Sequence, residues 1–208
     1  MFLALAIAVA SLEPASAAAV STSVTATVRA ASTIPDRLVD EALQEAAAIW
    51  QLNGVTLVWR TGEDGATGSA PSGVAFRVTF DDRAGTSGEY AATLGSIVFV
   101  NGVPLPDIRL SYANALELLR SLYGNGQLSQ MTTIERRMHL SRALGRALAH
   151  EVGHYLLASP DHTSQGLMKA RQIATDLFGP SRRRFELTDA QRCHALAHVQ
   201  SAEHVARR

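Results

Sequence analysis

The chain has 208 residues, of which 47% are hydrophobic and 18% are charged, so it is long enough to bury one sizeable core and to form one globular domain. Its 19 basic and 19 acidic residues give a formal net charge of zero, so the overall charge gives no reason to expect nucleic acid or acidic lipid as a partner. A single cysteine, Cys193, excludes an intramolecular disulfide.

The N-terminal segment indicates export. Residues 2–12 form an apolar run, and Ala15-Ser16-Ala17 supplies the small residues that a signal peptidase accepts, although no Lys or Arg precedes the run. The run is shorter than the about 20 residues of a membrane-spanning helix. We therefore expect a signal peptide over residues 1–17 and no stable membrane insertion. Export without disulfides suits a secreted protein of a bacterium, or one of its cell envelope or periplasm.

Residues 18–34 are rich in Ala, Ser, Thr and Val with weak alternation. This pattern fits a linker or a marginal edge strand, and we interpret the segment as a linker that leads to a catalytic domain over residues 35–208. The domain is expected to begin with a helix over residues 35–52, because its apolar residues recur at helical spacing. Two strands should follow, at residues 55–59 and 74–80.

The next strands are expected at residues 96–100 and 108–112. Pro104 and Pro106 lie between them and exclude a central strand there. Helical spacing then predicts several helices, namely residues 113–123, ended by Gly124, a long helix over 134–158, a short one near 171–178, and a last one from Asp189 with Thr188 as N-cap. Periodicity alone supports an α/β or α+β fold.

The most informative motif, His150-Glu151-Val152-Gly153-His154, lies at the end of the long predicted helix. Residues four apart on a helix lie about 40° apart around the axis and about 6 Å along it, so the two imidazoles can bind one metal ion. Glu151 lies about 100° from His150, where its carboxylate can take a proton from a zinc-bound water. Since catalytic zinc usually has three protein ligands, a third donor must come from elsewhere. The motif thus predicts a zinc hydrolase.

His162 is our expected third ligand. A continued helix would place it about 12 Å beyond His154, so the chain has to turn back. Pro160 disfavours helical geometry at Ser159 and allows that turn. Asp161 is the competing donor, because carboxylate oxygen also binds zinc, but three histidines are the commoner catalytic pattern.

Residues 140–170 resemble the metzincin zinc peptidases, whose pattern is H-E-x-x-H-x-x-G-x-x-H followed by a methionine-containing turn. In this resemblance the ligands are His150, His154 and His162, the base is Glu151, and the turn methionine is Met168. The third histidine follows the second by eight positions instead of six, and Leu157 stands at the family's glycine, which implies a longer loop. Gly166-Leu167-Met168-Lys169 is similar to the shortened turn of archaemetzincin-like proteins.

The resemblance implies a small twisted mixed sheet packed on long helices, with the metal in a cleft below the sheet. It also implies a zinc-dependent metalloendopeptidase whose partner is a peptide or protein. Its substrate would pair with an edge strand, either residues 96–100 or 108–112. The alternatives are a zinc amidase that acts on cell-wall material and a non-catalytic zinc-binding domain.

Other candidate features favour simpler interpretations. His194 and His198 are also four apart, next to Cys193, but no acidic residue stands between them, and we expect solvated side chains. The run Arg182-Arg183-Arg184 is expected to be a solvated loop. The sequence contains no P-loop, no glycine-rich dinucleotide fingerprint and no G-x-S-x-G elbow, which excludes nucleotide binding and serine hydrolysis as first choices.

Overall fold

The structure is a computed structural model that describes residues 22–61, 74–83 and 93–206. The predicted signal peptide and the first residues of the predicted linker lie outside these ranges. Within them, none of the helices combines the length and the apolar character that crossing a bilayer requires.

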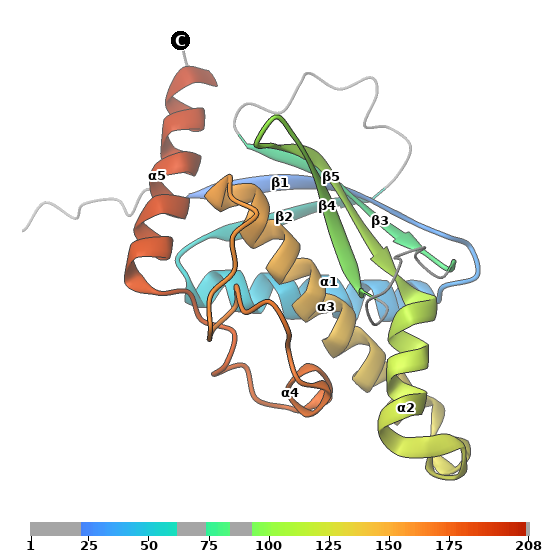
Figure 1. The fold of residues 1–208 in the computed structure, drawn as a ribbon. Helices are drawn as coiled ribbons and strands as arrows, with labels where there is room; N and C mark the ends of the chain where they lie inside the picture. The colour runs from blue at the N-terminus through green and yellow to red at the C-terminus, as the bar shows by residue number, and fades with distance from the viewer. Residues whose placement is uncertain (1–21, 62–73, 84–92, 207–208) are drawn as a thin grey trace, which may run out of the picture.

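A five-stranded mixed sheet forms one layer of the molecule (Figure 1). Its strand order is β2-β1-β3-β5-β4, in which β4 alone runs antiparallel to its neighbour. The strands are β1 (Ser23–Ala30), β2 (Thr56–Thr61), β3 (Ala75–Asp81), β4 (Gly95–Val100) and β5 (Val103–Ser111). Together with the helices this sheet confirms the predicted mixed α/β class.

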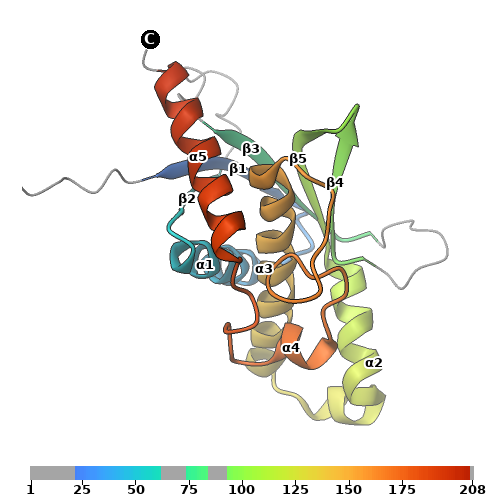
Figure 2. The same cartoon turned by 60° about the vertical axis from the view of Figure 1, so that its left-hand side comes forward.

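Two long helices cover one face of the sheet, and shorter elements lie around them (Figures 1 and 2). The helices are α1 (Asp36–Leu52), α2 (Tyr112–Gln130), α3 (Thr133–Leu157), α4 (Ala174–Phe178) and α5 (Asp189–Ala206). The helices α1 and α3 lie side by side beneath the strands, and α5 packs on α3. The expected first helix, the long helix and the last helix are thereby confirmed.

Alternation along the strands builds the core. Each of β1 and β3 buries every second residue toward the helices, as the run Phe76, Val78 and Phe80 shows. Burial of each large apolar side chain contributes about 1.5–3 kcal/mol. Trp50 of α1 is fully buried, and its indole N–H donates a hydrogen bond to the carbonyl of Ala149, 3.1 Å away. This bond fixes α1 against α3 immediately beside the histidine motif.

The helix α3 is well defined at both ends. Its N-terminus has a capping box in which the Thr132 hydroxyl accepts from the Glu135 N–H and the Glu135 carboxylate accepts from the Thr132 N–H. At its C-terminus Ala158 adopts a left-handed conformation with φ 47° and ends the helix. These two caps define the ends of α3, which is mostly buried from Leu140 onward and carries the motif near its C-terminus.

The predicted linker over residues 18–34 is wrong for Ser23–Ala30, which form the strand β1. This strand pairs on both sides, with β2 and with β3, and buries Val24, Ala26 and Val28. Its alternation is weak in sequence because small residues occupy both faces. Tertiary pairing, which a single sequence does not display, decides its structure.

The strand expected at residues 108–112 begins earlier, at Val103, so Pro104 and Pro106 lie within β5. The prolines were expected to exclude a central strand, and β5 is not paired on both sides at these positions. Pairing between β3 and β5 starts only at Asp107, so the proline segment has β4 as its one neighbour. Proline is tolerated where one side of the backbone needs no ladder partner. The helix expected to end at Gly124 instead continues to Gln130 after a kink at that glycine, which has φ 70°.

Candidate metal centre

Three histidines converge at the C-terminal end of α3. His150 and His154 come from the last turns of the helix and His162 from the loop that follows it. Their ligating ring atoms all lie within 4.8 Å of one another. Among the described residues, no other group of three or more His, Cys, Asp or Glu side chains approaches in this way. The predicted three-histidine set is thus brought together and could hold a metal ion.

Backbone carbonyls orient the first two rings. The Nδ1–H of His150 donates to the carbonyl of Leu167 at 2.7 Å, and the Nδ1–H of His154 donates to that of Ser159 at 2.8 Å. Each Nε2 atom therefore carries a lone pair and no proton. The two Nε2 atoms nevertheless lie 3.1 Å apart. Neither nitrogen has a hydrogen to give to the other, and a cation bound by both lone pairs would satisfy the two atoms.

Burial keeps both rings in the form that binds metal. It lowers the pKa of His150 from 6.5 to about 4, against the opposing effect of the hydrogen bond to Leu167. Burial lowers the pKa of His154 as well, again against its carbonyl partner. Neutral imidazole is the ligating species, so these rings need no deprotonation at neutral pH before a metal binds. The donor set fits zinc, which takes imidazole nitrogens at about 2.1 Å.

The loop after α3 turns back at once. The left-handed Ala158 starts the turn, and the Ser159 N–H donates to the carbonyl of His154. Beyond it, the Thr163 N–H donates to the carbonyl of Met168 at 2.8 Å, which fixes the position of His162 between two anchored points. The competing donor Asp161 accepts hydrogen bonds from the hydroxyl of Ser159 and shapes the loop instead.

The methionine of the motif lies in a tight turn below the helix. Gly166 has φ 80°, and a Cβ atom there would lie 2.5 Å from the carbonyl oxygen of Glu186, so only glycine fits. The turn aims the Leu167 carbonyl at His150 and places Met168, which is fully buried, against Gly153 of α3. The turn thus supports the part of α3 that carries His150 and His154.

Glu151 lies beside the histidines in a largely buried position. Its side chain is 8% exposed, and no hydrogen bond or ion pair reaches it from the described residues. Burial raises the pKa of its carboxyl group from 4.5 to about 8. Burying a carboxylate without a partner costs stability. Groups whose pKa values are perturbed in this way cluster at active sites.

The strand β4 closes the site from above. A Cβ atom at Gly95 would lie 2.8 Å from Cγ of Glu151, so the strand backbone rests directly on that side chain. The ring of Phe99 meets the ring of His154 edge to face, with centroids 6.3 Å apart. The strand β4 is a sheet edge, as expected for residues 96–100. The other candidate edge, residues 108–112, is wrong because β5 lies between β3 and β4.

A buried ion pair between Arg146 and Glu45, which the sequence did not predict, braces α3. The Arg146 side chain has no exposed surface, and its Nε donates to Glu45 Oε1 of α1 at 2.9 Å. The same guanidinium donates to the carbonyls of Asp176 and Leu177 in α4. Arg182 binds the second oxygen of Glu45, at 2.6 Å. The contact joins residues about a hundred positions apart, and no local pattern in the sequence indicates it.

The second histidine pair lies on α5 and belongs to no group of three or more ligating side chains among the described residues. The Nδ1 atom of His198 lies 2.9 Å from the carbonyl of Leu156, so this ring fixes α5 on α3. His194 and the exposed Cys193 join no cluster of ligating groups within the described residues. His194 is exposed, as expected, whereas His198 is half-buried and hydrogen-bonded and so differs from the solvated side chain that was expected.

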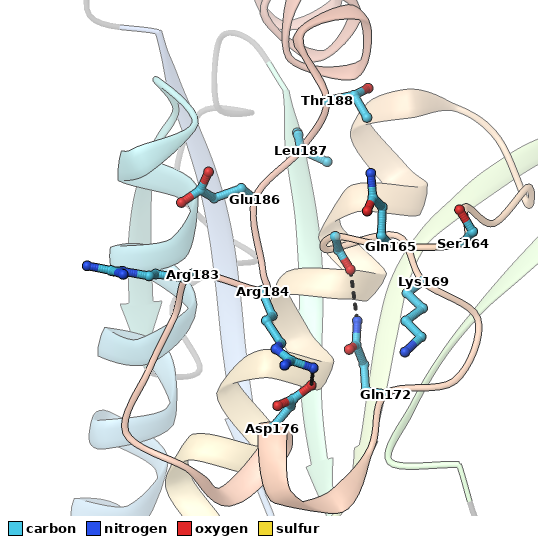
Figure 3. A pocket seen from close by; sticks show the side chains of 11 residues that line it. Ser164, Gln165, Lys169, Gln172, Asp176, Arg183, Arg184, Glu186, Leu187 and Thr188 are labelled. Carbon is cyan, nitrogen blue, oxygen red and sulfur yellow. Dashed lines mark hydrogen bonds and ion pairs between the residues drawn. The ribbon is translucent and has the colours of Figure 1, made fainter.

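A separate pocket of about 430 Å³ lies beside the methionine turn (Figure 3). Its wall includes Gly166, whose carbonyl accepts from Gln172 Nε2 at 3.0 Å, and Arg184, which binds Asp176 at 3.1 Å. None of the three converging histidines lines it. The pocket shares the turn with the metal centre but contributes no ligand to it.

Comparison with known proteins finds a likeness of fold to a solved structure. No protein-family model matches the chain, and no curated protein matches it significantly. Among solved structures, the fold is similar to that of a zinc-dependent peptidase from Methanocorpusculum labreanum (strain Z), with a TM-score of 0.53 and 10% identity. The match covers 83% of this chain and 99% of the other. At this identity the likeness concerns the fold.

Proposed function

We propose that the chain is a zinc-dependent metalloendopeptidase of metzincin-like, archaemetzincin-like architecture. In this proposal His150, His154 and His162 hold the zinc ion and Glu151 is the general base. The observation that carries it is the pair of proton-free Nε2 atoms 3.1 Å apart, with a third histidine beside them. The fold shared with a zinc-dependent peptidase supports the same reaction class.

Each part of the site has a role in peptide hydrolysis. A zinc ion bound there supplies Lewis acidity, which polarises the scissile carbonyl and makes a water molecule more acidic. Glu151 takes the proton from the attacking water and returns it to the nitrogen of the leaving amine. Its buried position against Gly95 raises the pKa of the carboxyl group and so strengthens the carboxylate as a base. The free edge of β4 offers backbone N–H and C=O groups that align an extended peptide above the histidines.

The test of the base is Glu151→Gln, which keeps the shape of the side chain and removes its basicity. We expect unchanged zinc content and a loss of several orders of magnitude in kcat/KM on a quenched-fluorescent peptide library. Glu186→Gln, at an exposed carboxylate, is the matched control and should leave the rate unchanged. Full activity of the Glu151 variant would exclude the proposed role.

Two alternatives give different outcomes in the same assays. Hydrolysis of purified peptidoglycan without any peptide-library cleavage would assign the site to a cell-wall amidase. Zinc-loaded protein that cleaves neither substrate would assign a non-catalytic zinc-binding domain. A signal peptide over residues 1–17, and with it a secreted or envelope location, stays a prediction that N-terminal sequencing of the exported protein can test.

A further inference from the structure

The sheet face opposite α1 and α3 carries exposed arginines. On each strand, the residues that alternate with the buried ones point to this outer face. They include Arg29 on β1, Arg60 on β2, Arg77 on β3 and Arg109 on β5, all of them exposed. No helix of the described chain packs across this face (Figures 1 and 2).

The strand register sets these arginines in two rows. Arg60 and Arg77 both stand opposite Thr27 of β1. Arg29 and Arg109 both stand opposite Thr79 of β3, in the next row along the strands. Since neighbouring strands lie about 4.8 Å apart, the two arginines of a row are about 10 Å apart, and the rows are about 7 Å apart. Four guanidinium groups thus share one flat area.

Few carboxylates neutralise this area. Among the described strand residues, the outer face has two acids, Asp81 and Asp107, and the Asp107 carboxylate lies 3.5 Å from Nε of Arg109. Within the same ranges, no ion pair or hydrogen bond reaches the side chains of Arg29, Arg60 or Arg77. The formal net charge of zero therefore conceals a local excess of positive charge.

An aliphatic patch lies beside the arginines on the same face. The β4–β5 hairpin extends past the end of the β3 pairing (Figure 2). The burial alternation of its two strands leaves apolar residues exposed on the outer face. These are Val98, Val100, Val103 and Leu105, which are 57%, 49%, 63% and 40% exposed. Ser96 of β4 stands opposite Arg109 of β5, and Val100 stands opposite Val103, so the patch and the arginines share one face.

We propose that this outer face docks the protein peripherally on a bilayer rich in anionic lipid. Guanidinium groups bind acidic headgroups in a forked geometry, and exposed aliphatic side chains at a hairpin tip can enter the interfacial region. The combination favours lipid over single-stranded nucleic acid, which is usually held by aromatic stacking, because the outward-facing residues of the described strands include no aromatic side chain.

Docking in this way leaves the metal centre free. Gly95 and Phe99 of β4 face Glu151 and His154, on the opposite side of the strand from Val98 and Val100. The bilayer would contact one side of the hairpin while the other side lines the candidate site. The proposal does not rest on the proposed function, since the arginines and the patch bind lipid whether or not the metal centre is catalytic.

The test uses the full chain and vesicles of two compositions, phosphatidylcholine alone and equal parts of phosphatidylcholine and phosphatidylglycerol. Flotation should show binding to the mixed vesicles only, weakened as salt shortens the Debye length. Arg77→Gln with Arg109→Gln should lower the affinity about twenty-fivefold, at about fivefold per arginine. Val100→Ser with Val103→Ser should also weaken binding, and this loss should persist at high salt.

Matched variants separate this face from net charge and from general hydrophobicity. Arg37→Gln with Arg120→Gln removes the same charge from α1 and α2, and Leu52→Ser with Ile134→Ser removes exposed apolar side chains elsewhere. Both controls should bind as the wild type does, and thermal melting should confirm that every variant is folded. The proposal would be overturned if the controls lost as much affinity as the face variants, or if the protein bound both vesicle types equally. It would also be overturned if the protein bound duplex DNA or polyglutamate but not vesicles. The Glu151→Gln variant should bind the mixed vesicles as the wild type does, so that a failure of lipid binding and a failure of catalysis can be told apart.

Discussion

The sulfur atom of Met168 fills the space that a side chain at position 153 would need. A Cβ atom built on Gly153 would lie 2.3 Å from Sδ of Met168 and 3.1 Å from its Cε, far inside van der Waals contact. Both residues are buried. The glycine between the two histidines of the motif thus lets the methionine turn approach α3 closely, which holds the Leu167 carbonyl within reach of His150.

Replacing Gly153 with alanine should therefore destabilise the protein by about 1–3 kcal/mol, the usual cost of overpacking a tight interior. Denaturant unfolding measures this loss. Gly126→Ala is the matched control, because nothing lies within 4 Å of a Cβ atom there, and its stability should stay within about 0.5 kcal/mol of the wild type. Gly153→Ala combined with Met168→Ala should cost less than the sum of the two single losses, and strictly additive effects would contradict the contact.

The approach of β4 to Glu151 predicts a different phenotype at Gly95. A Cβ atom at position 95 would press on Cγ and Oε1 of Glu151, at 2.8 Å and 3.2 Å. Gly95→Ala should displace the carboxylate and lower kcat/KM by about ten- to a hundredfold, with unchanged zinc content. Ser96→Ala, on the outer face of the same strand, is the control. Wild-type kinetics in Gly95→Ala would show that the carboxylate position does not matter for the rate.

The buried ion pair between Arg146 and Glu45 should be costly to break. Arg146→Ala leaves a buried carboxylate with only Arg182 as its partner, and we expect a loss of about 3–5 kcal/mol in the free energy of unfolding. Arg120→Ala removes an exposed pair with Glu117 and should cost at most about 1 kcal/mol. Similar losses in both variants would mean that the buried pair does not brace α3.

Stability of the metal-free protein should depend on pH through Glu151. Its pKa is about 8 in the folded protein and 4.5 in the unfolded chain, so the stabilising effect of the protonated form is present below pH 4.5 and is lost as pH rises through 8. His150, with a pKa lowered to about 4, acts in the opposite direction, and its effect is confined mainly to pH values below 6.5.

Between pH 6.5 and 8, therefore, the free energy of unfolding of the metal-free protein should fall with a slope of up to about 1.4 kcal/mol per pH unit. Denaturant unfolding at several pH values measures this slope. Glu151→Gln should flatten the curve in this window and raise stability at pH 8. An identical slope in the variant would assign the effect to another group.

Sequence patterns predicted the parts of the molecule whose signals are local. The helix α3 has its cap, its apolar spacing and its histidines within one continuous segment, so its bounds and three of the four proposed site residues could be read directly. His162 could be predicted because Pro160 forces the chain to turn. The strand β1 was missed because small residues on both of its faces hide the alternation of a strand. Its structure is decided by pairing with β2 and β3, which the sequence does not display.

The features that sequence could not supply depend on contacts between distant segments. The carbonyls of Leu167 and Ser159, which orient the histidine rings, belong to the backbone and have no residue signature. Gly95 is a glycine in a strand, and such a residue indicates close approach of another group without saying which. Its partner, Glu151, lies in an element more than fifty residues later.

Crystallography with anomalous scattering at the zinc edge can show whether the three imidazoles hold one zinc ion. We predict a single peak about 2.1 Å from a ring nitrogen of each of His150, His154 and His162. A peak with Asp161 in place of His162, a peak at His194 and His198, or no peak in zinc-saturated crystals would contradict the account.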